Sequence, residues 1–291
     1  MRQALKKAFL VLASAVFVPY AFSYSVRDIR GTAFEFRQPP KVVTVSPSAT
    51  QAVYAAGAGS CLLANSRYCD YPLEARGKPK IGGILDLDYE KIVSLKPDIV
   101  IMPDISDSRV SQRLESLGIK CFFVHNEGFE HIADDVRLIG KLFNSESESE
   151  RAAAEFEKVV DRISREKIGA GKRALFMFFG NIAAGSGSYV DGIMKLMGLE
   201  NCAAKSGRAW PALSREFILA SGVEVLFVEL APGENPDAIL AKYKNDPVWE
   251  TSPAIAKGNV CFVPREFIVV PSLRIVEAMN LMAEFLQKRT K

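Results

Sequence analysis

NSESESERAAAEFEKVVDRISREKIGAG, residues Asn144–Gly171, is the stretch that decides how this chain of 291 residues is organised. Either Asn144 or Ser145 can cap a helix, and the glutamates that follow suit the positive end of its dipole. Basic residues gather toward its other end, and Gly169 can stop it. Apolar residues recur every three or four positions, namely Ala152, Phe156, Val159, Val160 and Ile163. About twenty residues give a helix of roughly 30 Å, the width of a small domain. Because α/β-type patterns flank the stretch on both sides, we interpret it as a rigid strut between two lobes rather than an ordinary surface helix.

The length of the chain suggests about two domains. We therefore divide it into a leader (1–23), an N-terminal lobe (24–143), the bridging helix (144–171) and a C-terminal lobe (172–291). A hydrophobic fraction of 48% and a charged fraction of 24% are typical of a globular protein. The net charge of +3 is too small to argue for nucleic acid or an acidic membrane as a partner.

The first residues have the features of a secretory signal. Arg2, Lys6 and Lys7 precede an apolar run from Ala8 to Val18, and Ala21-Phe22-Ser23 offers small residues for cleavage after Ser23. The run is short for a membrane anchor and is followed by Pro19. No cysteine stands at the cleavage point. The sequence therefore predicts an exported, periplasmic protein that is soluble after cleavage.

Five cysteines are an odd number for an exported chain. Cys121 and Cys261 lie inside apolar, strand-like runs and read as buried thiols. Cys61 and Cys69 are close enough in sequence to form a disulfide, whereas Cys202 lies in a loop-like stretch. The sequence alone leaves the pairing open.

Apolar runs alternate with helical patterns along both halves of the chain. In the first half, short apolar runs begin at Val42, Cys61, Ile99 and Cys121, and amphipathic segments separate them. This alternation predicts an α/β fold with parallel sheets. Ligands of such sheets gather at the carboxyl ends of the strands. Ser48, which follows the first of these strands and which we expect to cap the next helix, is one candidate contact.

Four ordered motifs resemble the periplasmic binding proteins of ABC importers for iron complexes and cobalamin. They are PPKVVTVSPSATQAVYAAGAG, RYCDYPLEARGKPKIGG, LDYEKIVSLKPDIVI and RLESLGIKCFFV, and the similarity continues over nearly the whole mature chain. The resemblance implies two Rossmann-like lobes joined by one long rigid helix, with the ligand in the cleft between them. It also implies a monomer that binds a metal complex and delivers it to a permease and, through the permease, to its ATPase.

The residues that we expect in the cleft are mostly aromatic. Flat rings and a few polar groups suit a large, ring-like or chelated ligand. Trp210, next to Pro211 and outside any periodic run, is placed there by its loop position and by the resemblance. Arg67, Arg208 and Arg265 could meet the acidic groups of such a ligand. The expected ligand-binding set is Ser48, Tyr68, Tyr71, Phe179, Tyr189, Trp210, Arg265 and Phe267.

The resemblance also suggests how the protein would dock on its permease. In the cobalamin-binding relatives a glutamate at the tip of each lobe pairs with permease arginines. Glu216 holds the position in the second lobe. The corresponding position in the first lobe falls near Ser108, and Asp107 or Asp104 is the nearest acid. Pro103 also stands where the cobalamin binders have a tryptophan.

The sequence contains no recognisable catalytic set. There is no nucleophile elbow, no paired-histidine zinc helix and no dinucleotide fingerprint, and we expect no cofactor. With only two histidines, His125 and His131, a site for free Zn²⁺ or Mn²⁺ is disfavoured. The main hypothesis is a binding protein for a ferric siderophore, haem or cobalamin. The alternative is an exported α/β enzyme that acts on a small polar substrate.

Overall fold

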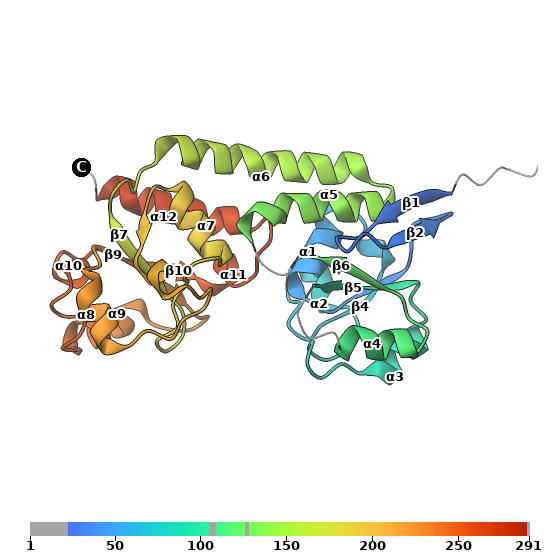
Figure 1. Ribbon diagram of the computed structural model, residues 1–291, viewed down its shortest axis with the longest axis horizontal. Coiled ribbons are helices and arrows are strands. Elements are labelled where there is room, and N and C mark those ends of the chain that lie inside the picture. The colour runs from blue at the N-terminus through green and yellow to red at the C-terminus, as the bar shows by residue number, and fades with distance from the viewer. Residues whose placement is uncertain (1–22, 105–108, 126–127, 290–291) are drawn as a thin grey trace, which may run out of the picture.

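The computed structural model describes residues 23–104, 109–125 and 128–289. They form two α/β lobes, one from each half of the chain, with a long helix running across both (Figure 1). The predicted two-lobed α/β architecture with parallel sheets is thereby confirmed. The expected signal sequence falls almost entirely in residues 1–22, which lie outside the described residues.

The N-terminal lobe is built on a four-stranded parallel sheet in the order β4-β3-β5-β6, preceded by an antiparallel β1–β2 hairpin. Its strands are β1 (Tyr24–Arg27), β2 (Ala33–Phe36), β3 (Val42–Thr44), β4 (Leu62–Asn65), β5 (Ile99–Pro103) and β6 (Cys121–Val124). Its helices are α1 (Pro47–Ala55), η1 (Gly59–Cys61), α2 (Leu73–Arg76), α3 (Tyr89–Leu95), α4 (Arg109–Ser116), η2 (Phe129–His131) and α5 (Ile132–Phe143).

The C-terminal lobe repeats this arrangement. Its parallel sheet has the order β10-β9-β7-β8. In each parallel sheet the strand that comes first in the chain, β3 or β7, lies between the strands that come second and third. The strands are β7 (Arg173–Met177), β8 (Glu200–Asn201), β9 (Val225–Leu230) and β10 (Val260–Pro264). The helices are α7 (Tyr189–Leu196), η3 (Cys202–Ser206), α8 (Arg215–Ser221), α9 (Pro236–Asn245), α10 (Pro253–Ala256), α11 (Arg265–Ile268) and α12 (Ile275–Lys288).

The central strands of the parallel sheets are mostly apolar because both faces of each sheet are covered. All five residues of β5 are buried, and so are all four of β6. Continuous rather than alternating apolar runs are what a parallel sheet between two layers requires. Apolar clusters lie on each sheet, and the side chains of Phe122 and Phe176 are fully buried in their respective lobes.

The bridging helix α6 (Glu146–Glu166) has 21 residues. It is shorter than the stretch read from the sequence. Its N-cap is Ser145, whose side chain makes no capping hydrogen bond, and its C-cap is the left-handed Lys167. Asn144 (φ 53°) ends α5, so it does not cap α6, and Lys167 (φ 40°) ends α6 before Gly169 is reached. Helix α5 runs alongside α6, so the strut is double over part of its length (Figure 1).

A second junction joins the lobes beside the cavity described below. Phe129, from the short helix η2 of the N-terminal half, belongs to the apolar cluster of the C-terminal lobe. It packs against Gly192 of α7, where an added Cβ would come within 2.7 Å of the Phe129 Cβ. Any larger residue at 192 would push these two elements apart. The lobes are therefore held together by close packing as well as by the strut.

The cysteine pairing that the sequence left open is settled by the structure. All five cysteines are free thiols, so no Cys61–Cys69 disulfide forms. Cys69 is buried, and its Sγ lies 3.0 Å from Thr50 Oγ1 on α1. Burial raises the pKa of the Cys69 thiol. This thiol therefore packs as a small buried group in the N-terminal lobe.

Within the described ranges, 23–104, 109–125 and 128–289, no helix is both long enough and apolar enough to cross a membrane.

Candidate functional site

A cavity of about 880 Å³ lies between the lobes, within the range of about 300–1,000 Å³ typical of small-molecule sites. Several parts of the N-terminal lobe line it: helix α1 and the residues that follow it, the segment around Tyr71 and Pro72, the end of β6 with His125 and His131, and the start of α5. The C-terminal lobe contributes Pro271–Glu277, the segment that leads into α12. The cavity is therefore built from both halves of the chain, as the predicted cleft requires.

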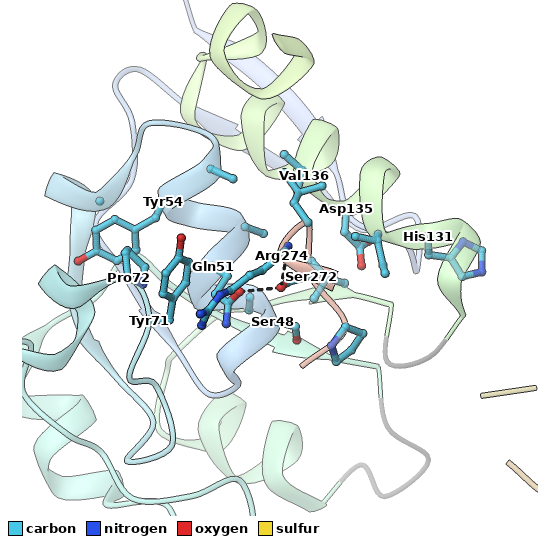
Figure 2. Close-up of a pocket in the computed structure, with 18 of the residues that line it drawn as sticks. Ser48, Gln51, Tyr54, Tyr71, Pro72, His131, Asp135, Val136, Ser272 and Arg274 are labelled. Carbon is cyan, nitrogen blue, oxygen red and sulfur yellow. Dashed lines mark hydrogen bonds between the residues drawn. The ribbon is translucent and has the colours of Figure 1, made fainter. Parts of the chain in front are cut away.

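The first cross-lobe contact in the cavity is a hydrogen bond. The Ser272 hydroxyl donates to Gln51 Oε1 on α1 at 2.6 Å, joining residues 221 positions apart (Figure 2).

The second is a stack around Arg274. Its guanidinium carbon lies 4.3 Å from the centre of the Tyr71 ring and 5.1 Å from that of Phe267. Arg274 therefore lies between one aromatic ring from each lobe. Its Nε donates to Glu277 Oε1 at 3.3 Å, and stacking on the rings leaves the other N–H groups able to donate to acidic groups of a ligand.

The segment that carries Tyr71 is held in place by Lys80. The Lys80 ammonium donates to Asn65 Oδ1, to the carbonyl of Cys69 and to that of Ala75, at 2.8, 2.8 and 3.0 Å. Asn65 is fully buried at the end of β4, and its own amide donates to the Ala75 carbonyl. These bonds fix both ends of the 66–75 loop, and with it the position of the Tyr71 ring.

Two of the predicted contact residues line the cavity. Ser48 stands in the first turn of α1, with its Oγ 3.1 Å from that of Ser46. The helix cap is Ser46 rather than Ser48, because the Ser46 side chain accepts the Ala49 N–H at 3.3 Å. Ser48, one position inside the helix, is thereby left to face the cavity. Tyr71 also lines the cavity, and Phe267 borders it through its contact with Arg274.

Tyr189 and Trp210 lie in the C-terminal lobe away from the cavity lining. Tyr189 is only 4% exposed, and its hydroxyl donates to the Ile268 carbonyl at 2.7 Å. Trp210 is half-buried, edge-on to Phe178 at 5.3 Å and 5.4 Å from the Tyr189 ring. The structure therefore gives Tyr189 the contacts of a core residue. A ligand contact at Trp210 stays a prediction.

The remaining predicted residues are also outside the lining. Tyr68 and Phe179 are exposed, at 64% and 71%, one on each lobe. Arg265 donates to the buried carboxylate of Glu229 at 2.5 Å, a pairing that raises the pKa of the Arg265 guanidinium. Its charge is thus already engaged, because an unpaired buried carboxylate at Glu229 would be costly. Arg67 is similarly paired, with Asp86.

Glu216, the predicted docking residue of the second lobe, is exposed in the first turn of α8. The cap expected at Ser214 is confirmed, because its side chain accepts the Phe217 N–H at 3.2 Å. Hydrogen bonds from its own backbone N–H and from Ser214 lower the pKa of Glu216, so it is charged at neutral pH. Asp107, its expected counterpart, lies outside the described residues. Asp104, the other acid considered, accepts a hydrogen bond from the Arg30 guanidinium.

Sequence reasoning missed several cavity residues. The sequence pattern predicts that Arg274 lies in a C-terminal helix from Pro271 to Gln287, which gives no reason to place its side chain in a ligand site. His125 and His131 are too few to favour a site for a free metal ion. The sequence does place His125 at the carboxyl end of a strand, where ligands gather. Its pairing with His131 and Asp135 was not predicted. The missed lining residues used below are Gln51, His125, His131, Asp135, Ser272 and Arg274.

Among the residues that the structure describes, no cluster of three or more His, Cys, Asp or Glu side chains could hold a bare metal ion. The cavity offers instead stacked rings, a cation and scattered polar groups. Such a lining suits a preformed organic or chelated ligand.

Comparison with known proteins also indicates a binding protein. The model of a family described as "Periplasmic binding protein" matches residues 42–266. The vitamin B12-binding protein of Salmonella choleraesuis (strain SC-B67) is 32% identical over 199 residues, which cover 67% of this chain and 74% of that protein. The vitamin B12-binding protein of Vibrio campbellii is 25% identical over 248 residues, covering 84% and 88%.

Solved structures share the fold. The vitamin B12-binding protein BtuF of Vibrio cholerae superposes with a TM-score of 0.75 at 23% identity, covering 87% of this chain and 99% of that one. The haem-binding protein HutB of Vibrio cholerae gives a TM-score of 0.73 at 19% identity, covering 84% and 98%.

Proposed function

This chain belongs to the periplasmic binding protein family, and from that premise we propose that it captures a chelated-metal ligand and delivers it to the permease of an ABC importer. The proposed ligand is cobalamin, haem or a ferric siderophore. The observation that carries the proposal is the cavity lined by both lobes, where Arg274 lies between Tyr71 and Phe267. Flat rings and a guanidinium match a flat tetrapyrrole edged with amides or carboxylates.

The exported-enzyme hypothesis is not supported. The family and the curated relatives are binding proteins, so an enzyme on this chain would depart from all of them. Cobalamin and haem enter this proposal as transported ligands, and the protein needs no resident cofactor to bind them.

The proposal includes the route and the location. We place the cleavage of a signal peptide after Ser23, which releases a monomer into the periplasm. The domains then divide at 143/144 and 171/172, on either side of α6. Glu216, with Asp107 as its proposed counterpart, contacts the permease, which couples delivery to its ATPase.

A thermal-shift panel tests the ligand class. The purified protein is melted with cyanocobalamin, haemin, a ferric hydroxamate and a ferric catecholate, each with its metal-free counterpart where one exists. A ligand that binds only the folded state raises the melting temperature in a concentration-dependent way. The proposal expects such a rise for at least one metal complex. No rise with any of them would count against it.

A further inference from the structure

The two histidines of the chain meet at one end of the cavity. His125 follows β6 and His131 ends η2, and both line the cavity. Their rings are stacked, with centroids 3.8 Å apart and planes within 7°. In Figure 2, His131 and Asp135 lie at the opposite end of the cavity from Tyr54 and Tyr71. The cavity therefore has an aromatic end and an imidazole end.

Asp135 fixes the His125 ring. Its carboxylate lies on α5 and accepts from His125 Nδ1 at 2.7 Å and from the His125 backbone N–H at 3.3 Å. Burial raises the pKa of Asp135, and the hydrogen bond from His125 opposes that rise. With the Nδ1 proton donated to Asp135, the neutral ring carries its lone pair on Nε2.

His131 limits the movement of the His125 ring by stacking on it. Gly128 leaves the space for it, because a Cβ at that position would come within 2.7 Å of His131 Cδ2. His131 Nε2 lies 3.7 Å from Glu130 Oε1, on the outer side of the pair. The stack restricts rotation of His125 about its own hydrogen bond. The ring is thus held at two places before any ligand arrives.

A carboxylate that orients a histidine through one ring nitrogen is the usual support of a metal-ligating imidazole. The absence of a three-donor cluster among the described residues argues against a bare cation. A single oriented imidazole is enough only when the metal arrives with its other positions already filled by a chelator.

Resting on the proposed function, we propose that His125 Nε2 is an axial ligand for the metal of the bound complex, with Asp135 as its positioning residue. The Nε2 lone pair forms the bond to the metal, and the axial water that held that position leaves. The proton on Nδ1 stays in its hydrogen bond to Asp135. The site thereby selects metal tetrapyrroles that have an exchangeable axial position.

Two matched probe pairs test this selection. Haemin has exchangeable axial positions, whereas protoporphyrin IX has the same ring and no metal. Aquacobalamin has an exchangeable water, whereas cyanocobalamin holds cyanide there. Each probe is titrated into the wild-type protein, His125→Ala, Asp135→Asn and the control Asp134→Asn. Asp134 is the neighbouring α5 carboxylate, 66% exposed and 3.7 Å from Arg137, and it is not among the cavity residues.

In at least one pair, the exchangeable probe should bind the wild-type protein more tightly than its partner. Its visible absorption spectrum should also change to that of an imidazole complex. His125→Ala should remove both effects, and added imidazole should restore the spectrum. Asp135→Asn should weaken binding of the exchangeable probe about 10- to 100-fold, the usual loss when such a positioning residue is removed. Asp134→Asn should behave as wild type.

A preference for the exchangeable probe that persists unchanged in His125→Ala would overturn axial ligation, and so would equal binding of the two members of every pair that binds, with no spectral change. Either result leaves the proposed function standing, because the complexes still bind. Failure of all four probes and of the siderophores to bind the wild-type protein would instead overturn the proposed function.

Discussion

The guanidinium carbon of Arg274 lies 4.3 Å from the centre of the Tyr71 ring, so the start of α12 in one lobe is stacked on a loop of the other. The Arg274 side chain is 19% exposed, and it also donates to Glu277 at 3.3 Å. This contact shapes the cavity wall and joins the lobes at the same time.

Replacing Arg274 should separate stacking from charge. Arg274→Ala should weaken binding of the preferred metal complex by about 1–2 kcal/mol, because a desolvated cation–π partner is lost. Arg274→Lys keeps the charge but not the planar face, so it should lie between wild type and alanine. Isothermal titration calorimetry measures both variants. Wild-type affinity in Arg274→Ala would mean that Arg274 does not contact the ligand.

The two tryptophans should differ in their roles. Trp249 is 6% exposed and packs edge-on to Tyr243 at 5.0 Å. Trp249→Ala should therefore cost about 3–5 kcal/mol of unfolding free energy and leave affinity nearly unchanged. Trp210→Ala should weaken binding by about 1–3 kcal/mol if its ring reaches the ligand.

A Trp249→Phe variant leaves Trp210 as the single tryptophan, whose emission can be excited selectively. Its emission should then respond to saturating ligand. No change in emission, together with wild-type affinity in Trp210→Ala, would assign Trp210 to the core with Tyr189.

The ion pairs between α5 and α6 should make stability depend on pH. Arg137 makes two hydrogen bonds to Glu157, at 2.6 and 2.8 Å, and two to Glu150, at 2.7 and 3.0 Å. These contacts lower the pKa of both carboxyl groups. A lowered pKa stabilises the fold above the ordinary carboxyl pKa, and this stabilisation is lost as the pH falls through the folded-state value.

Arg137→Met should therefore be less stable than wild type at neutral pH. The Arg137–Glu157 pair should account for less than about 1 kcal/mol, because it is largely solvent-screened. The difference should shrink as the pH falls below about 4. Urea unfolding at several pH values measures this difference in unfolding free energy. The control is Arg151→Met, at an exposed position of α6. A constant difference between Arg137→Met and wild type at all pH values would show that lost packing, not charge, is responsible.

Glu216 should act in delivery and not in capture. Because Glu216 is exposed on α8, Glu216→Ala should keep wild-type affinity but slow uptake into vesicles that carry the matching permease. Charges at the rim of an interface mainly set the docking rate and register. Asp107→Ala should have a weaker effect, and the double variant the strongest. The difference from wild type should shrink at high salt, because salt also screens the steering by these charges in the wild-type protein. Glu284→Ala, exposed on α12, is the control. Normal uptake by the double variant would remove both residues from docking.

Features that depend only on residues close together in the sequence were predictable. The caps, charges and spacing around α6 are local, and so is the alternation that produces two parallel sheets. The Ser214 cap was predictable for the same reason. The left-handed conformation of Lys167 was not, because a lysine carries no sequence signal for positive φ. Asn144 was considered only as a cap of α6, although asparagine also favours the left-handed end of a preceding helix.

The cavity depends on contacts that no local pattern carries. Ser272 and Gln51 are 221 positions apart, and Phe129 leaves its own half of the chain to pack on α7. Tyr189 shows the same limit. A helix pattern predicts that one face is apolar, but it does not say whether a tyrosine on that face reaches a ligand or ends against the Ile268 carbonyl. The paired histidines become visible as a unit only once the fold brings their rings together.

The central claim is that the protein binds a metal complex between its lobes without transforming it. The most direct test is a calorimetric titration of the purified, exported protein with cyanocobalamin, haemin and ferric siderophores, followed by chemical analysis of the recovered ligand. The account predicts saturable binding of one of these, at one ligand per protein, and recovery of that ligand unchanged. Absence of saturable binding for all of them, or conversion of a ligand to product without a stoichiometric complex, would contradict it.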